Sequence, residues 1–226
     1  MPSFVPPRLA GDAPVVGVGN DLSIAALHDA YGQGVFPWPI PGYPLLWFCP
    51  PRRAVLDFDR LHVPARLARL RRRTALTFTL DRAFDAVIAA CRQMPRPKQE
   101  GTWITPPLLH AYRAFHRAGY AHSVEAWDES GVLVGGLYGV AVGGVFSGES
   151  MFHRAPNASK LALLFLADHL RARGLGWMDI QVMTPHLAAL GAHEIPRDEF
   201  LDRLETEHAR LATVRLTPEL FSPACL

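Results

Sequence analysis

Glu149, Asp179 and Gln181 are polar side chains that the sequence places in apolar segments. Glu149 lies within Phe146–Phe152, and a carboxylate there must be paired or functional, because burying a lone charge is costly. Asp179 and Gln181 are two residues apart in the apolar segment Trp177–Met183, so in a strand they share one face. A carboxylate there can hold a cation, and an amide can direct a hydrogen bond but cannot take up a proton. A half-exposed edge strand would show the same alternation, and this alternative stays open.

Two tryptophans stand in loops where we expect them to be exposed. Trp38 lies between Pro37 and Pro39, and Trp103 comes just before a predicted helix. A loop tryptophan often plugs a core, and it is also a natural surface on which a nucleobase stacks. Residue types alone favour the plug and leave the stacking surface as the alternative.

The basic residues are concentrated in one stretch of the chain. Asp57 and Asp59 are the only acids in it, so the stretch carries +6 in a chain whose net charge is +2. Such a stretch can form an electrostatic surface that binds phosphates. The alternative is a solvated helix face in a protein that prefers arginine, since only two of the 23 basic residues are lysine. The stretch contains Arg52, Arg53, Arg60, Arg66, Arg69, Arg71, Arg72 and Arg73.

Several common kinds of site have no sequence support. There is no GxxxxGK[ST] or GxSxG motif, and Gly135-Gly136 and Gly143-Gly144 fall inside predicted strands rather than at a strand-to-helix turn. They are better explained by β-bulges or by close backbone approach. The ten histidines lack paired metal spacing, and the three cysteines are an odd number without CxxC. We therefore expect no metal and no cofactor, and a buried structural Cys49 in preference to a catalytic thiol.

Length and composition indicate a globular protein that can bury a core, and not a disordered one. The chain has 226 residues, of which 49% are hydrophobic and 19% charged, which suits one domain or one domain with a small appendage. Apolar runs such as Leu161–Ala167 are too short to span a bilayer. The first ten residues lack a secretory signal pattern, so we expect a cytoplasmic protein with no membrane association.

The elements that must position these residues alternate between helices and strands. Expected helices begin at Ser23, Pro64, Asp81, Thr105-Pro106, Asn157 or Ser159, Thr184-Pro185 and Arg197. Expected strands are 54–58, 75–80, His122–Trp127, Val132–Val140, Gly144–Gly148 and Trp177–Met183, with a polar loop over 93–101. The pattern predicts a mixed α/β fold whose sheet is mostly antiparallel.

Nine segments in order resemble the leucyl/phenylalanyl-tRNA–protein transferases, bacterial enzymes of the N-degron pathway. The most specific are Gly148–Phe152 (GESMF) and Asn157–Lys160 (NASK). The others are Tyr31–Trp38 (YGQGVFPW), Trp47–Leu56 (WFCPPRRAVL), Glu100–Thr105 (EGTWIT), Gly119–Glu125 (GYAHSVE), Val134–Val140 (VGGLYGV), Asp179–Val182 (DIQV) and Leu190–Pro196 (LGAHEIP).

The resemblance implies a fold, a reaction and partners. It implies a small N-terminal α+β domain (1–60) and a GCN5-related N-acyltransferase-like domain (61–226). Family members transfer Leu, Phe and, less well, Met from Leu-tRNA, Phe-tRNA or Met-tRNA to proteins with N-terminal Arg or Lys, marking them for degradation. The reaction is ester aminolysis without metal or ATP. Coenzyme A is not expected, and we expect a monomer.

The resemblance also assigns roles to residues. Glu149, Asp179 and Gln181 would be catalytic: Asp179 orients Gln181 and favours positive charge on the attacking nitrogen, and Glu149 binds the ammonium or the basic side chain. We expect Asp179→Ala and Gln181→Ala to lower turnover without unfolding the protein. Trp38 and Trp103 would hold the 3′-terminal adenosine. The remaining assignments are a side-chain pocket of Leu137, Phe146, Leu163 and Leu166, and tRNA-backbone contacts from Arg66, Arg69, Arg71, Arg72 and Arg73.

Two other functions compete with this one. A small-molecule N-acetyltransferase would use acetyl-CoA and would need a phosphate-binding turn where the helix begins at Asn157, which the sequence does not show. A non-catalytic tRNA- or RNA-binding module would use the arginines and tryptophans without needing Asp179 or Gln181.

Overall fold

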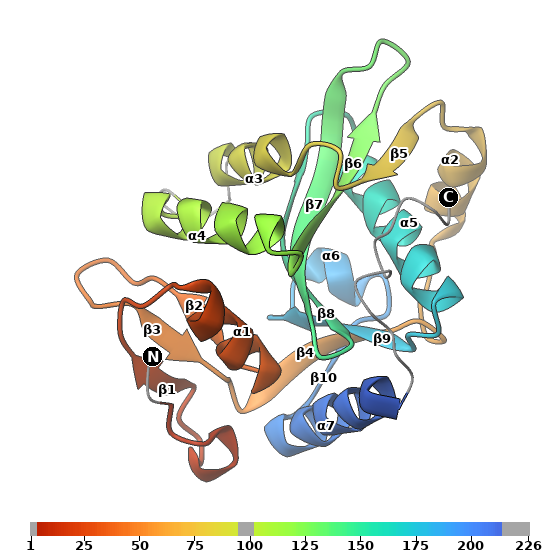
Figure 1. The fold of residues 1–226 in the computed structure, drawn as a ribbon. Coiled ribbons are helices and arrows are strands. Elements are labelled where there is room, and N and C mark those ends of the chain that lie inside the picture. The colour runs from red at the N-terminus through yellow and green to blue at the C-terminus, as the bar shows by residue number, and fades with distance from the viewer. Residues whose placement is uncertain (1–3, 95–101, 214–226) are drawn as a thin grey trace.

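Helices and strands are interspersed along the chain, as the sequence predicts (Figure 1). The computed structural model describes residues 4–94 and 102–213. Its helices are the 3-10 turn η1 (Pro7–Leu9), α1 (Ile24–Gly32), α2 (Ala65–Arg73), α3 (Phe84–Gln93), α4 (Pro106–Arg117), α5 (Ala158–Ala172), α6 (Pro185–Ala188) and α7 (Arg197–Thr213). Its strands are β1 (Val15–Val18), β2 (Phe36–Trp38), β3 (Leu46–Phe48), β4 (Arg52–Asp57), β5 (Thr77–Leu80), β6 (Ala121–Trp127), β7 (Leu133–Val142), β8 (Val145–His153), β9 (Trp177–Gln181) and β10 (His193–Pro196).

The strands form a small sheet and a large one. The small sheet has the order β1-β3-β2, and the large sheet has the order β10-β4-β9-β8-β7-β6-β5. Neighbours in the large sheet are antiparallel except β8 and β9, which run parallel and pair at Ser147 and Asp179. The predicted mixed α/β fold with a mostly antiparallel sheet is therefore confirmed.

Helices cover both faces of the large sheet. Helices α1, α3 and α4 pack on one face around Tyr138 and Val140 of β7, and α5 packs on the other around Leu137 (Figure 1). Contact with α5 is close, because a Cβ on Gly135 of β7 would lie 2.5 Å from the Cβ of Ala158. The glycine pair at 135–136 thus marks close approach, as its sequence position predicts.

Local signals locate most helix ends. Ser23 and Thr105 accept backbone hydrogen bonds at the starts of α1 and α4, as expected. The expectation for Asp81 is wrong: α3 begins at Phe84, and its N-cap position is Ala83. The Asp81 carboxylate instead accepts hydrogen bonds from His122 Nδ1 and the Ser123 amide, at 2.7 and 2.8 Å. Tertiary partners therefore outcompete the helix end for this side chain.

Strand β4 connects the two sheets in the chain but pairs only in the large one, with β9 and β10. The expected domain boundary at residue 60 falls after this strand, whereas the pairing places the change of sheet before Arg52. The predicted loop at 93–101 falls mainly on residues 95–101, outside the described residues. Within residues 4–94 and 102–213, every helix is too short or too polar to cross a bilayer.

Candidate active site

Asp179 lies at the centre of the large sheet and is fully paired. Both of its carboxylate oxygens accept hydrogen bonds from Arg53, at 2.8 Å from Nε and 2.7 Å from Nη2. Ser147 Oγ donates to the same carboxylate at 2.9 Å, as does the backbone amide of Gln181 at 2.9 Å. Strand β9 lies between β4 and β8 and is buried along its length, so the edge-strand alternative is excluded.

Arg53 is the residue of this site that the sequence did not reveal. It is 1% exposed, and its guanidinium lies between the rings of Phe36 and Phe200, 4.6 and 4.5 Å from their centroids. In the sequence it stands among the eight arginines of the basic stretch between Arg52 and Arg73. The available signal was its position in the strand Arg52–Asp57, where the three residues that follow it, Ala54, Val55 and Leu56, are apolar. Buried Arg needs a carboxylate, and Asp179 supplies it.

Gln181 ends β9 in a left-handed conformation, with φ of 62°. This conformation is costly for residues other than glycine, and such backbone strain is concentrated at functional sites. The strand expected to run to Met183 stops here, two residues early. Gln181 Nε2 donates to Glu149 Oε1 at 2.6 Å. The structure therefore brings together the predicted trio: Asp179 holds the backbone of Gln181, and the side chain of Gln181 contacts Glu149.

Glu149 is half-buried in the middle of β8, which extends to His153 rather than ending at Gly148. Tyr31 of α1 donates to its Oε1 at 2.6 Å, and Tyr112 of α4 donates to its Oε2 at 3.1 Å. Burial raises the pKa of Glu149 to about 7, although the hydrogen bonds from the tyrosines and Gln181 act in the opposite direction. Neither tyrosine could be connected with Glu149 from the sequence, because the three residues lie on different elements.

Trp38 and Trp103 stack on one another. Their ring centroids lie 5.4 Å apart and their planes differ by 12°. Trp38 is half-buried, whereas Trp103 is only 5% exposed, so the expectation of an exposed Trp103 is wrong. Its ring is covered because it packs in the core shared by α1, α3 and α4.

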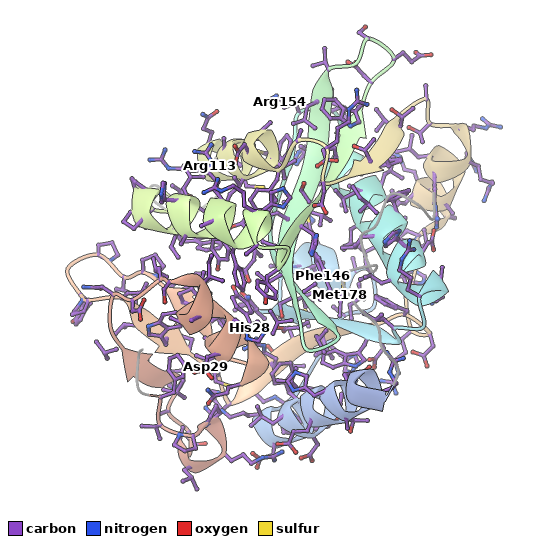
Figure 2. The ribbon with its side chains drawn as sticks, in the orientation of Figure 1. His28, Asp29, Arg113, Phe146, Arg154 and Met178 are labelled. Carbon is purple, nitrogen blue, oxygen red and sulfur yellow. The ribbon has the colours of Figure 1, made fainter. Side chains whose placement is uncertain are left out.

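The four predicted pocket residues belong to one apolar cluster between the large sheet and α5. None is more than 3% exposed. Phe146 and Met178, labelled in Figure 2, lie together in this cluster. At its margin are partly buried, adaptable side chains, among them Met151, two residues after Glu149 on the same strand. The cluster comprises, among others, Leu137, Phe146, Leu163 and Leu166.

The predicted basic helix is α2, and its arginines do not all face the same way. Arg66, Arg69 and Arg73 line a groove of about 740 Å³ with Lys160 and His186. Arg71 forms an ion pair with Asp168 of α5, and both Arg71 and Arg72 are exposed but do not line this groove. A spacing of three and then four residues places the groove-lining arginines on one helix face.

The described part of the chain offers no support for Cys49 as a catalytic thiol or for a metal site. Cys49 is fully buried, and burial raises the pKa of its thiol, which favours the unreactive protonated form and the structural interpretation. Among residues 4–94 and 102–213, His, Cys, Asp and Glu form no group that could hold a metal ion.

Comparison with known proteins identifies the family to which this chain is similar. Residues 55–205 match the family described as leucyl/phenylalanyl-tRNA protein transferase, and residues 20–51 match the N-terminal domain of the same family. The chain belongs to this transferase family. It is therefore an aminoacyltransferase, as the sequence resemblance implied.

Similar relatives carry the same family description over most of their length. A leucyl/phenylalanyl-tRNA–protein transferase of Syntrophus aciditrophicus is 50% identical over 197 residues, covering 87% of this chain and 82% of the relative. One from Maridesulfovibrio salexigens is 46% identical over 212 residues, covering 93% and 88%. One from Pseudoalteromonas atlantica is 46% identical over 224 residues, covering 97% and 95%.

Proposed function

We propose that the protein transfers leucine, phenylalanine and, less well, methionine from aminoacyl-tRNA to the α-amino group of proteins that begin with Arg or Lys. The observation that carries this proposal is the Glu149–Gln181–Asp179 constellation, which offers polar groups beside an apolar cluster suited to such side chains. The acceptor protein is thereby marked for degradation.

The reaction proposed is aminolysis of an ester. The aminoacyl ester is already activated, so the chemistry needs no ATP. The attacking α-amine has an ordinary pKa of about 7.7–8.0, so roughly a tenth to a fifth of it is neutral at pH 7. Because Gln181 Nε2 donates to Glu149, the amide oxygen of Gln181 is the atom that can accept a hydrogen bond from the amine and aim its lone pair. Orientation of this kind lowers the barrier.

Asp179 acts in this proposal as a positioning residue. Its charge is matched by Arg53 at 2.7 Å, so it does little to favour positive charge on the substrate nitrogen. It holds the backbone amide of Gln181 instead, at 2.9 Å, and so supports the left-handed turn. This replaces the direct electrostatic role expected from the sequence.

The test is transfer of radiolabelled leucine from charged tRNA to a model protein with an N-terminal Arg, with an N-terminal Gly protein as the control. Transfer to the Arg protein alone supports donor, acceptor and reaction together. Binding of tRNA without transfer, regardless of aminoacylation, would support a binding module, and acetyl-CoA-dependent thiol release would support an acetyltransferase.

Trp38 supplies the stacking face for the terminal adenosine in this proposal, and Trp103 supports it from behind. We expect Trp38→Ala to raise the apparent KM for aminoacyl-tRNA about 5- to 150-fold, since stacking on an aromatic ring contributes about 1–3 kcal/mol per base. Trp103→Ala should instead lower the free energy of unfolding by about 3–5 kcal/mol, as expected for truncation of a buried aromatic. Steady-state kinetics and urea unfolding measure the two effects. An unchanged KM for Trp38→Ala would mean that both tryptophan rings only pack in the core and do not bind the adenosine.

The groove-lining arginines of α2 are proposed to contact tRNA phosphates. Replacing Arg66, Arg69 and Arg73 with alanine should reduce the slope of log Kd against log salt by about 2–3 units, close to one per lost phosphate contact. Removal of Arg72, which does not line the groove, should change the slope by less than about one unit. Equal slopes for the triple variant and the wild type would mean that α2 is only a solvated basic face and does not contact tRNA phosphates.

We also propose a division of the chain into a small N-terminal unit and a GCN5-related acyltransferase-like unit. The pairing of β4 with β9 and β10 favours a boundary before Arg52 over one at residue 60. The separate family matches to residues 20–51 and 55–205 support the same division.

A further inference from the structure

Three polar groups from different elements form a closed triangle at the site. The Tyr31 hydroxyl lies 2.6 Å from Glu149 Oε1, and the Tyr112 hydroxyl lies 3.1 Å from Glu149 Oε2. The two hydroxyls lie 2.7 Å from each other. All three distances are within hydrogen-bond range.

Counting protons shows that the triangle is one proton short when Glu149 is ionised. The pKa of each tyrosine is raised well above its ordinary value, mainly by burial and also by the charge of Glu149, so each hydroxyl keeps one proton. A carboxylate only accepts, so two protons must serve three contacts. If Oε2 of Glu149 is protonated, it donates to Tyr112, Tyr112 donates to Tyr31, and Tyr31 donates to Oε1. Every contact is then a hydrogen bond.

We propose that Glu149 takes up the proton that the acceptor's α-ammonium group must lose, and that Tyr31 and Tyr112 are positioning residues for this step. The inference rests on the proposed function and assigns a role in it. Gln181 donates to Glu149 Oε1, so its amide oxygen can hold the amine beside the carboxylate that receives the proton.

The proton and bond balance closes without a further reactant. An N–H bond of the ammonium breaks and the proton passes to the carboxylate of Glu149, leaving a neutral amine. The amine nitrogen forms a bond to the ester carbonyl carbon and becomes cationic, while the π pair of the C=O bond moves to the carbonyl oxygen. That pair then re-forms the C=O bond as the C–O bond to the tRNA ribose breaks, and a proton from the cationic nitrogen passes to the departing ribose oxygen. Glu149 finally releases its proton to water, for which its half-buried position provides a path.

The charges around Glu149 suit this exchange. Burial raises its pKa to about 7, with Asp179 acting in the same direction, while Tyr31, Gln181 and Tyr112 lower it through hydrogen bonds. Arg53 faces the same region and is paired with Asp179. An acceptor near pKa 7 is well matched to an amine of about 7.7–8.0, and a catalytic base works best near the working pH.

The experiment is a pH profile of the single-turnover transfer rate at saturating Leu-tRNA and N-terminal Arg peptide, with spontaneous ester hydrolysis subtracted. We expect the wild-type rate to level off above about pH 7. The rate of Glu149→Gln should be about three- to fivefold lower near pH 7, where half of Glu149 is ionised and roughly a tenth to a fifth of the amine is neutral, and it should approach the wild type by pH 9, where the amine loses its proton unaided. If Glu149 had only a structural role, the ratio of the wild-type rate to the Glu149→Gln rate would be the same at every pH. A role in binding the ammonium would raise KM and leave the saturated rate unchanged.

The tyrosines provide a second, milder test in folded protein. Tyr31→Phe and Tyr112→Phe each open the triangle and remove a hydrogen bond to Glu149, so the acid limb of the profile should shift along the pH axis while the plateau stays. Tyr120→Phe is the matched control, since its ring packs on Phe115 outside the triangle, and its profile should match the wild type. The inference would be overturned if the rate of Glu149→Gln were lower by the same factor at every pH. It would also be overturned if the pH profiles of both tyrosine variants matched the wild type. In either case, transfer by the wild type would still support the proposed function. If the wild type did not transfer leucine to the Arg peptide, both the inference and the proposed function would be wrong.

Discussion

Asp179→Ala is expected to lower the free energy of unfolding by about 3–5 kcal/mol, because it leaves a buried guanidinium without its counter-ion. Arg53 and Asp179 are 1% and 0% exposed, and water cannot replace the lost partner. Ser147 Oγ and the Gln181 amide also lose their acceptor. The sequence-based expectation that this variant would fold normally is therefore replaced by a prediction of marked instability.

Urea unfolding of the purified variants measures this effect. Asp202→Ala is the matched control, since Asp202 pairs with Arg8 at 2.7 Å but is 68% exposed, and its loss should cost less than about 1 kcal/mol. Adding Arg53→Met to Asp179→Ala should recover part of the lost stability by removing the stranded charge. If Asp179→Ala unfolds at the same urea concentration as the control, the ion pair does not stabilise the fold.

The pair also shows where sequence reasoning stopped. Asp179 and Glu149 could be singled out because a carboxylate in an apolar segment is anomalous by itself. Arg53 sits among several arginines, so its charge is not anomalous in the sequence. Only the pairing of β4 with β9, strands separated by more than a hundred residues, makes it the partner of Asp179. Non-local pairing of this kind leaves no trace in spacing along the chain.

Helices were easier to predict than side-chain partners. Ser23 and Thr105 cap helices through contacts three residues away, and such contacts are encoded locally. Asp81 has the same local signal but binds His122 and the Ser123 amide across the sheet. Trp103 is likewise a loop residue by sequence and a core residue by packing. In both cases tertiary contacts, which the local pattern does not contain, decide the outcome.

The backbone conformation and the side-chain contact of Gln181 favour different residue types. Its left-handed backbone would suit glycine, which adopts a φ of 62° without steric cost. Glutamine therefore bears a steric cost at this position, and its side chain reaches Glu149 at 2.6 Å. Gln181→Gly should relieve the backbone strain while removing the amide that aims the amine.

We accordingly expect Gln181→Gly to lower the rate of leucine transfer by about 10²–10³-fold, the usual cost of losing a group that orients or stabilises the reacting centre. Its free energy of unfolding should stay within about 1 kcal/mol of the wild type, because relieved strain offsets the greater freedom of glycine in the unfolded chain. Gln181→Asn keeps an amide and tolerates the backbone, but its shorter side chain should not restore the rate. Single-turnover transfer and urea unfolding on the same samples separate the two effects. A stable Gln181→Gly variant with wild-type transfer would show that Gln181 takes no part in the reaction, whereas inactivity with unfolding would show that it acts only through the fold.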